Sequence, residues 1–364
     1  MPQIKSLKRT PLYVSHRDLG ARMVGFGGWD MPVQYQGILD EYQAVRQRVG
    51  IFDICHMGEF LLHGSPLSTG LDRLVTQSLT DLPSGSCRYG FLLNESGGVL
   101  DDLIIFRLAQ ERWMLVVNAA TAERDAKHIR SFLDQPDAFE DISQLTGKID
   151  VQGPASRDFL KSWVEDIERL DYYTCKEYDI FGCRVLISRT GYTGELGYEL
   201  YLPWDSTRDV WESFLKAGAL PAGLGARDIL RIEVGYPLYG HELDEEHSPL
   251  TAGMSRLIDW QKEFIGSSAL KTERQNGITE KIVTVAAENR RSPRAGQPVL
   301  RDGRGIGVVT SGTFSPCLQR GVALARVSRD GCSLGDAVEI GTDRRPISGE
   351  VVPRKVYTQG TLNS

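Results

Sequence analysis

Apolar residues along this chain follow two kinds of pattern. Short runs rich in Val and Ile and bounded by turn residues are typical of β-strands, whereas apolar residues repeating every three or four positions predict amphipathic helices. The strand pattern occurs at residues 51–62, 87–94, 99–106, 113–118, 149–154, 184–189, 198–202, 306–316 and 321–327. The helical pattern occurs at residues 16–23, 38–48, 66–82, 119–133, 157–160 and 223–233. The chain therefore predicts a mixed α+β fold.

The order of these elements divides the chain. Residues 51–144 run β, α, β, β, β, α, which predicts a compact α+β unit. A polar stretch at 272–277 is expected to be a linker, and the strand and turn patterns after it predict a small all-β domain at 276–364. The Gly-rich stretch 25–32 lacks a dinucleotide-binding spacing and predicts a packed turn. A chain of 364 residues exceeds one ordinary core, so two or three domains are expected.

Composition and charge argue against several classes of function. Hydrophobic residues make up 41% and charged residues 25%, as in ordinary soluble proteins, and a net charge of −6 argues against binding to nucleic-acid phosphates. No apolar run is long enough to span a membrane, and the N-terminal residues lack the apolar core of a signal peptide. Six scattered cysteines and six scattered histidines show no metal-ligand spacing. We therefore expect a cytoplasmic protein without a disulfide framework or a catalytic metal.

The stretch from Ser96 to Phe106 contains two adjacent carboxylates, Asp101 and Asp102, inside a buried strand pattern that follows a Gly-Gly turn. Strand side chains alternate between two faces, so the two aspartates point in opposite directions and each needs its own explanation. A buried carboxylate is costly unless it is paired, and burial raises its pKa toward the range useful for proton transfer. A structural explanation is also open, in which one aspartate caps the turn and the other forms a salt bridge.

Further polar residues stand in apolar surroundings. Glu199 lies inside an apolar strand pattern, and Arg227 and Arg231 lie on one helix face, with Asp228 placed to pair with Arg231. The same spacing is typical of a solvated helix face. Asn118, between a strand and a helix, is expected to cap the helix or to contact a ligand. Carboxylates, a guanidinium and nearby Trp and Tyr rings are the parts of a site for a flat, polar heterocycle such as a pterin.

Taken together, several motifs resemble the aminomethyltransferase (T-protein) family of the glycine cleavage system. They occur in the family's order over nearly the full length, and they are specific jointly rather than singly. The matching stretches are Thr10-Pro11-Leu12-Tyr13, Gly28-Trp29 with Met31-Pro32, Phe52-Asp53 with His56-Met57, Gly97-Gly98-Val99-Leu100-Asp101-Asp102-Leu103, Val117-Asn118-Ala119, Gln152-Gly153-Pro154, Gly191-Tyr192-Thr193-Gly194-Glu195, Gly223-Leu224-Gly225-Ala226-Arg227-Asp228 and Thr310-Ser311-Gly312-Thr313-Phe314-Ser315-Pro316.

The resemblance implies an α+β multidomain chain with three domains in a cloverleaf-like arrangement around a folate cavity. It implies a discontinuous folate-binding domain at 1–50 plus 145–270, with a ferredoxin-like α+β unit inserted at 51–144 and carrying the acidic motif. The all-β domain at 276–364 is expected to be barrel-like or jelly-roll-like. The implied reaction moves the one-carbon unit of aminomethyl-dihydrolipoyl H-protein to tetrahydrofolate, giving 5,10-methylenetetrahydrofolate and ammonia.

The resemblance also assigns roles to individual residues. Asp102 corresponds to the family's key acidic residue, expected to handle protons at folate N5 and the departing amine. Glu199 and Arg227 fall where the family holds the pterin. The other residues expected to line the folate cavity are Met57, Tyr89, Asn118, Tyr192, Tyr239 and Trp260. The expected partners are tetrahydrofolate and the lipoylated H-protein.

Relatives on the same fold leave two alternatives. Iron–sulfur-assembly relatives carry a cysteine in the motif that corresponds to residues Arg189 to Glu195, and this chain has no cysteine there. The sarcosine and dimethylglycine dehydrogenases need an additional flavin domain, for which the chain is expected to have no room. A folate-dependent demethylase of a small methylated substrate remains an enzymatic alternative. A non-catalytic, folate-binding regulatory protein is the alternative from another class.

Overall fold

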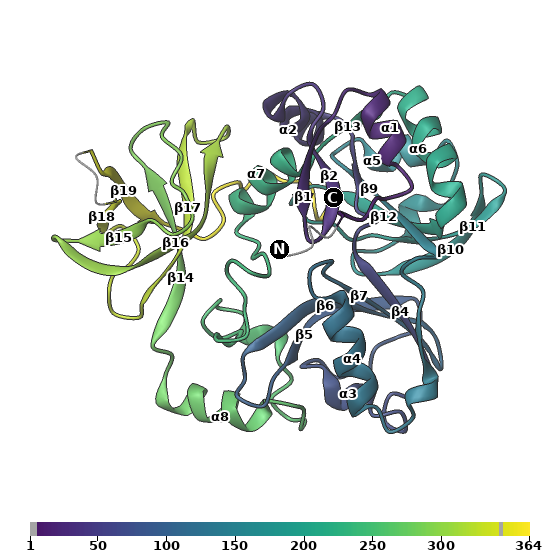
Figure 1. Ribbon diagram of the computed structural model, residues 1–364, viewed down its shortest axis with the longest axis horizontal. Coiled ribbons are helices and arrows are strands. Elements are labelled where there is room, and N and C mark those ends of the chain that lie inside the picture. Colours follow the sequence, from purple (N-terminus) through teal and green to yellow (C-terminus); the bar gives the residue numbers. More distant parts are fainter. Residues whose placement is uncertain (1–5, 342–344) are drawn as a thin grey trace.

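Three lobes surround the middle of the molecule in Figure 1, one built on a six-stranded sheet, one on a five-stranded sheet and one on a closed barrel. The structure, a computed structural model, describes residues 6–341 and 345–364. The expected α+β multidomain fold with a C-terminal β-barrel is confirmed. Residues 1–5 of the predicted 1–50 segment and residues 342–344 of the predicted barrel domain lie outside the described residues. The boundaries of the domains stay a prediction.

The six-stranded sheet is assembled from distant parts of the chain. Its strand order is β10-β11-β12-β9-β3-β13, antiparallel except for the pair β13–β3. Its strands are β3 (Gly50–Asp53), β9 (Thr146–Gln152), β10 (Cys175–Ile180), β11 (Cys183–Ser188), β12 (Gly197–Pro203) and β13 (Leu220–Pro221). The helices of this lobe are α1 (Tyr13–Asp18), α2 (Ile38–Gln47), α5 (Ser156–Leu160), η2 (Ile167–Arg169), η3 (Trp204–Ser206), α6 (Thr207–Lys216) and α7 (Leu224–Val234). Its core contains the buried side chains of Tyr198, Trp211 and Phe214.

The five-stranded sheet forms the lobe that carries the acidic motif. Its strand order is β5-β6-β7-β4-β8, antiparallel throughout. Its elements are β4 (Gly58–His63), α3 (Leu71–Leu74), β5 (Ser86–Leu93), β6 (Val99–Ala109), β7 (Arg112–Val117), α4 (Ala122–Phe132), η1 (Pro136–Ala138) and β8 (Phe139–Asp141). Helices α3 and α4 contribute Leu74 and Ile129 to a core with Leu103 and Ile105 of β6. The strands predicted at 87–94 and 99–106 are confirmed as β5 and β6, which pair as an antiparallel hairpin.

The barrel closes in the order β14-β17-β16-β15-β18-β19, with antiparallel pairs throughout. Its strands are β14 (Glu280–Ala287), β15 (Pro298–Arg301), β16 (Arg304–Ser315), β17 (Arg320–Ser328), β18 (Ala337–Ile340) and β19 (Ile347–Val352). Between α7 and β14 the chain forms the short η4 (Ser255–Leu257) and helix α8 (Ser267–Asn276). The strands predicted at 306–316 and 321–327 are confirmed as β16 and β17.

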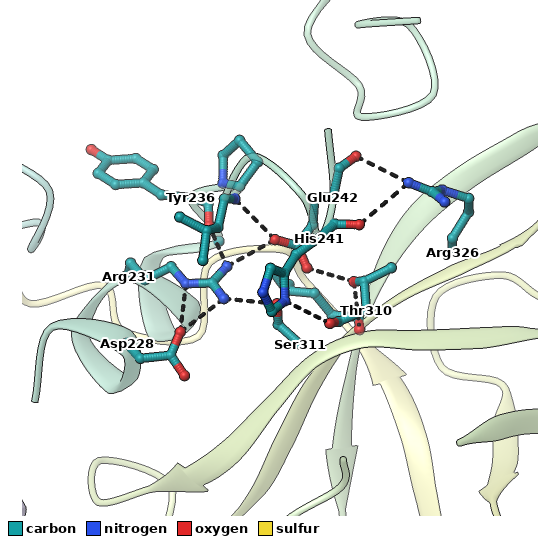
Figure 2. A network of polar contacts seen from close by, with 12 residues as sticks. Asp228, Arg231, Tyr236, His241, Glu242, Thr310, Ser311 and Arg326 are labelled. Carbon is teal, nitrogen blue, oxygen red and sulfur yellow. Dashed lines mark hydrogen bonds and ion pairs between the residues drawn. The ribbon is translucent and has the colours of Figure 1, made fainter. Parts of the chain in front are cut away.

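A buried polar network joins α7 to the barrel (Figure 2). Arg231, 1% exposed, donates to Glu242 at 2.8 Å and to the Ser311 hydroxyl of β16 at 2.7 Å. Asp228 pairs with Arg231 at 2.8 Å, as predicted, and Thr310 donates to Glu242. The interpretation of this helix face as solvated is therefore wrong for Arg231, because the barrel covers it.

The Gly-rich stretch 25–32 is not a packed turn but a β-hairpin of β1 (Arg22–Phe26) and β2 (Trp29–Gln34). Gly27 and Gly28 form its two-residue loop with φ values of +56° and +85°. A two-residue loop with positive φ at both positions matches the twist of the flanking strands, and Gly adopts it without steric cost. The missed signal was the Gly-Gly pair itself.

Three predicted helical or linker segments differ from the structure. Only Leu71–Leu74 of the predicted helix 66–82 is helical, because Val75 is extended and bridges to Leu92 of β5. Residues 272–276 of the predicted linker 272–277 belong to α8, whose Leu270 is completely buried. The predicted helix 16–23 lies earlier, as α1, and its end belongs to β1. Within the described residues, none of the helices combines the length and apolarity needed to cross a lipid bilayer.

Candidate functional site

Strand β6 presents Asp101 and Asp102 in different surroundings. Asp101 is completely buried, whereas Asp102 is partly exposed. Asp102 accepts a hydrogen bond from the Tyr89 hydroxyl of β5 at 2.8 Å and another from the side-chain amide of Asn118 at 3.0 Å. Burial, and then the nearby Asp101 carboxylate, raise the pKa of Asp102 to about 7. A carboxyl group with this pKa can give or take a proton near neutral pH.

The turn before β6 ties the two aspartates to the segment that follows α7. Gly98 lies so close to this segment that a Cβ there would be 1.8 Å from the carbonyl oxygen of Glu245. The Asn94 side chain closes the turn by accepting the Gly98 N–H at 2.9 Å, and the Val99 N–H donates to the Asp244 carbonyl at 2.9 Å. The Gly-Gly pair is therefore required by close backbone approach as well as by the turn.

Asn118, directly after β7, connects the two aspartates. Its backbone N–H donates to Asp101 Oδ2 at 2.9 Å, and its side-chain amide donates to Asp101 Oδ1 at 2.9 Å as well as to Asp102. Helix α4 has no side-chain hydrogen bond at its N-cap, so the interpretation of Asn118 as a cap is wrong. The structural explanation of the aspartates also fails, since among the described residues neither caps the turn or forms an ion pair with a cation.

A second polar cluster lies on the six-stranded sheet. Lys148, Asp150 and Gln152 alternate along β9 with apolar residues, and each of the three is at most 1% exposed. In the register of β12 and β9, Glu199 lies directly opposite Asp150. Two carboxylates at such cross-strand positions repel each other, so this pair needs compensating groups.

Two cations provide the compensation. Arg227 of α7 donates to Asp150 at 2.6 Å, and the Lys148 Nζ lies 3.3 Å from Glu199 Oε1. Glu199 also accepts the hydroxyl hydrogen bond of Thr190. Burial raises the pKa of Asp150 to about 6, whereas Lys148 and Thr190 overcome the opposing effect of burial and lower the pKa of Glu199. The predicted pterin-binding residues Glu199 and Arg227 thus share one cluster, linked through Asp150.

Tyr192 contacts Arg227 of this second cluster. The Arg227 guanidinium is 5.0 Å from the centre of its ring, and its hydroxyl donates to the Pro237 carbonyl. The charge of Asp102 contributes, after burial, to its raised pKa. Met57 lies at the second cluster, where its sulfur accepts from the Lys148 Nζ at 3.5 Å.

The other predicted cavity residues gather around β5 and β6. Tyr89, Tyr239 and Trp260 pack on one hydrophobic cluster, whose buried members include Phe91 and Leu243. The Tyr239 hydroxyl accepts from Arg124 at 3.0 Å. The Trp260 indole donates to the Ser255 carbonyl at 3.2 Å, so its contacts with the predicted site are apolar.

Sequence reasoning missed the polar face of β9. Lys148, Asp150 and Gln152 stand at every second position, which is the spacing of one strand face. The signal was therefore present, but the apolar residues between them marked only a strand. Thr190, which hydrogen-bonds Glu199, carried no such signal because it lies outside the strands.

Comparisons with known proteins agree over the whole chain. The family profile described as the GCVT N-terminal domain matches residues 12–262, and the glycine cleavage T-protein C-terminal barrel domain matches residues 281–358. The aminomethyltransferase of Pseudothermotoga lettingae is 41% identical over 366 residues, covering 98% of this chain and 100% of that protein. The aminomethyltransferase of Rubrobacter xylanophilus is 42% identical over 356 residues, covering 97% and 95%.

A solved structure extends the agreement to three dimensions. The glycine cleavage system aminomethyltransferase T from Bartonella henselae superposes with a TM-score of 0.90 at 30% sequence identity, covering 98% of this chain and 99% of that one. Both domains of the family profile, two relatives of full length and the shared fold point the same way. The chain therefore belongs to the glycine cleavage T-protein family of aminomethyltransferases.

Proposed function

We propose that this chain moves the one-carbon unit of aminomethyl-dihydrolipoyl H-protein to tetrahydrofolate, as the aminomethyltransferase of a glycine cleavage system. The similarity over the full length to proteins named aminomethyltransferase favours this reaction over a demethylase or a regulatory folate-binding protein. Within the molecule, the observation that carries the proposal is Asp102, a partly exposed carboxyl with a pKa of about 7 held by Tyr89 and Asn118.

Tetrahydrofolate is the proposed co-substrate, and the described residues fit its pterin ring. A pterin needs aromatic faces, a guanidinium that donates to its carbonyl and carboxyl groups that accept from its N–H edge. Arg227 lies against the Tyr192 ring, and its ion pair with Asp150 fixes its direction while 15% of its side chain stays exposed. We assign Arg227 and Glu199 to the pterin, and to the walls Met57, Tyr89, Asn118, Tyr192, Tyr239 and Trp260.

The proposed reaction needs proton transfer and no change of oxidation state at the protein. The methylene carbon leaves the lipoyl sulfur and the amino nitrogen and forms bonds to N5 and N10 of tetrahydrofolate. The two protons from these nitrogens end on the departing ammonia and on the dihydrolipoyl thiol. Asp102 is the group we assign to this transfer, and its ionised form stabilises positive charge on the methylene carbon.

The lipoylated H-protein is the proposed partner and the cytoplasm the proposed location. An aminomethyl group carried on a lipoyl arm must be delivered by a carrier protein, since the donor is not a free small molecule. Support for the location comes from the six cysteines, all of which are free thiols, as is usual in a reducing compartment.

The test is reconstitution with tetrahydrofolate and aminomethyl-loaded H-protein, measuring methylenetetrahydrofolate and ammonia together. The wild type is expected to form both in equal amounts. Asp102→Asn is expected to bind tetrahydrofolate with similar affinity and to lose roughly 10²–10⁴-fold in turnover, the usual contribution of a general acid–base group.

Asp302→Asn is the matched control, because this carboxyl is 93% exposed at a turn of the barrel, and it should keep full activity. Folate binding without turnover would contradict the aminomethyl donor, and methylated small substrates would then test the demethylase. Folate binding with no turnover on either class would favour the regulatory alternative. Full activity of Asp102→Asn would contradict the assignment of the proton transfer.

A further inference from the structure

Lys148, a buried lysine of β9, has no part in the binding roles assigned above. Its residue is 1% exposed, and its Nζ lies 3.3 Å from Glu199 Oε1 of β12. The same Nζ donates to the Met57 sulfur at 3.5 Å and lies 4.9 Å from the centre of the Tyr201 ring. A buried ammonium group is costly unless a specific partner compensates it, so the ion pair with Glu199 is what makes this position tolerable.

The two oxygens of Glu199 have different partners. Oε1 pairs with Lys148, and Oε2 accepts from the Thr190 hydroxyl. A carboxylate offers about four lone-pair positions, so these two partners leave acceptor positions unused. A pterin presents neighbouring N–H donors along one edge, and two parallel hydrogen bonds from that edge need a carboxylate whose oxygens both accept. A protonated Glu199 would lose one of these acceptors to its own O–H.

The other charged groups around Glu199 do not replace Lys148. Arg227 also acts on Glu199, but its guanidinium is held by Asp150 at 2.6 Å. Asp150 lies opposite Glu199 in the strand register, and a second carboxylate there disfavours the ionised form of Glu199. The further titratable groups that face Glu199 are Glu59, Cys87, Tyr173 and Tyr201, none of which is a cation. The ammonium group of Lys148 is therefore the charge that balances Glu199.

Glu59 of β4 does not compete for this lysine. It is completely buried, and among the described residues neither of its carboxyl oxygens has a hydrogen-bond partner or forms an ion pair with Lys148. Burial raises the pKa of Glu59 well above its usual value, so this carboxyl is uncharged near neutral pH. Glu199 is equally deprived of water, but there Lys148 outweighs burial and lowers the pKa. The two buried glutamates thus differ in charge because one has the ammonium group at 3.3 Å and the other does not.

We propose that Lys148 is a positioning residue of the pterin site, whose ammonium group holds Glu199 as a full carboxylate that accepts from the N–H edge of the ring. Lys148 itself touches no substrate and takes no part in proton transfer. Its charge keeps Glu199 in one ionisation state across the neutral pH range, so that Glu199 binds the ring equally well throughout that range. This inference rests on the proposed assignment of the pterin to Glu199, and its test measures binding rather than turnover.

The test measures the dissociation constant of tetrahydrofolate by equilibrium dialysis from about pH 6 to about pH 9, as a ratio to the wild type so that titration of the ligand cancels. Lys148→Met leaves burial of Glu199 unopposed, and binding should be roughly 10–100-fold weaker near pH 6 and recover as the pH rises. Lys148→Arg keeps the charge and should restore most of the affinity and the constant ratio. Lys161→Met is the matched control, because this lysine is 46% exposed, and it should bind like the wild type.

Two results would overturn the proposal. The first is an equal loss of affinity at every pH in Lys148→Met and Lys148→Arg, which would make the lysine merely structural. The second needs no lysine variant and decides the matter if those variants fail to fold: ¹³C NMR of the glutamate carboxyl carbons, with Glu199→Gln to identify the signal. Glu199 should titrate below the ordinary glutamate value of about 4.3, and titration at or above it would contradict the proposal. Failure of the proposed function would look different, with tetrahydrofolate bound in the expected pH-dependent way but no methylenetetrahydrofolate formed.

Discussion

Two buried polar clusters in this protein balance their charges in opposite ways. In the network that holds the barrel, Arg231 meets two carboxylates, Glu242 and Asp228, and the hydroxyls of Thr310 and Ser311 complete the hydrogen bonds (Figure 2). In the acidic cluster, formed by Asp101 and Asp102, the described contacts come from the Asn118 amide and the Tyr89 hydroxyl rather than from a cation.

The pKa values record this difference. Although burial opposes it, Arg231 lowers the pKa of Glu242, which stays ionised and fixes the barrel. In the acidic cluster burial is not offset, and the pKa of Asp102 rises to about 7. A buried charge that is matched stabilises one arrangement of the chain, whereas an unmatched one is ready to exchange a proton. The comparison predicts which substitutions harm folding and which harm chemistry.

The largest effect is expected for Arg231→Met, which leaves Glu242 buried without its cation. Removing one partner of a buried ion pair typically costs about 3–5 kcal/mol, so the free energy of unfolding in urea should fall by that amount. Asp228→Asn is the control, because its side chain is 44% exposed, and about 0–1 kcal/mol is expected. Equal losses in the two variants would show that burial is not what separates them.

Asp102→Asn is expected to have the opposite effect on stability. Burial raises the pKa of Asp102 from its ordinary value of about 3.8 to about 7, so its contribution to stability is present at low pH and is lost as the pH rises through about 7. At pH 8 the variant should be more stable than the wild type by about 1–3 kcal/mol, and the gain should shrink toward pH 4. Unfolding in urea at several pH values measures it.

The Arg231–Glu242 ion pair of the barrel network is expected to show the opposite pH dependence. Because the pKa of Glu242 is lowered, its contribution is present above its unfolded pKa and is lost as the pH falls. The loss of unfolding free energy caused by Arg231→Met should therefore become smaller as the pH falls. Parallel pH dependences for the two variants would contradict the assignment of opposite charge balance.

Tyr89→Phe is expected to have a smaller effect, on Asp102 alone. The Tyr89 hydroxyl donates to Asp102 at 2.8 Å and lowers the pKa of that carboxyl. Its removal should therefore raise the pH at which Asp102 is half ionised, measured by ¹³C NMR of the aspartate carboxyl carbons. The loss of a hydrogen bond to a charged group is worth about 1.5–3 kcal/mol when buried and less when water can replace it, so a shift of roughly one pH unit is expected. Tyr13→Phe on α1, the control, should leave the titration midpoint of Asp102 unchanged.

The sequence predicts the two clusters unequally, for physical reasons. The alternation around Asp101 and Asp102 is local, so the separation of their faces could be predicted from β6 alone. The partners could not, because they depend on the register of other strands and on helix packing. Asn118 reaches both aspartates only because β7 pairs with β6, and Asp150 meets Glu199 only through the pairing of β9 with β12.

The same limit applies to the fold. The hydrophobic pattern at 66–82 marks Leu71, Leu74 and Val75 as buried, as they are, but it also includes Leu67, which is exposed, and its spacing does not reveal that the chain leaves the helix at Val75. The Arg231 face was ambiguous for a related reason, since a charged helix face is solvated unless another part of the chain covers it. Here the barrel, more than 70 residues later in the sequence at Thr310 and Ser311, covers it.

The smallest effect is expected for an exposed ion pair, Arg208 and Glu212, which tests whether burial or contact distance sets the strength of an ion pair in this protein. Arg208 and Glu212 lie one turn apart on α6 at 2.8 Å, the same distance as Arg231 and Glu242, but their side chains are 49% and 37% exposed. Water screens both the charges and the loss of a partner, so Glu212→Gln should cost only about 0.2–0.5 kcal/mol, and the order of arginine before glutamate favours the lower value. A double-mutant cycle with Arg208→Gln measures the coupling, which added salt should reduce further. A coupling comparable to that of the buried pair would mean that contact distance sets the strength of these ion pairs, and the contrast between the two clusters would lose its physical basis.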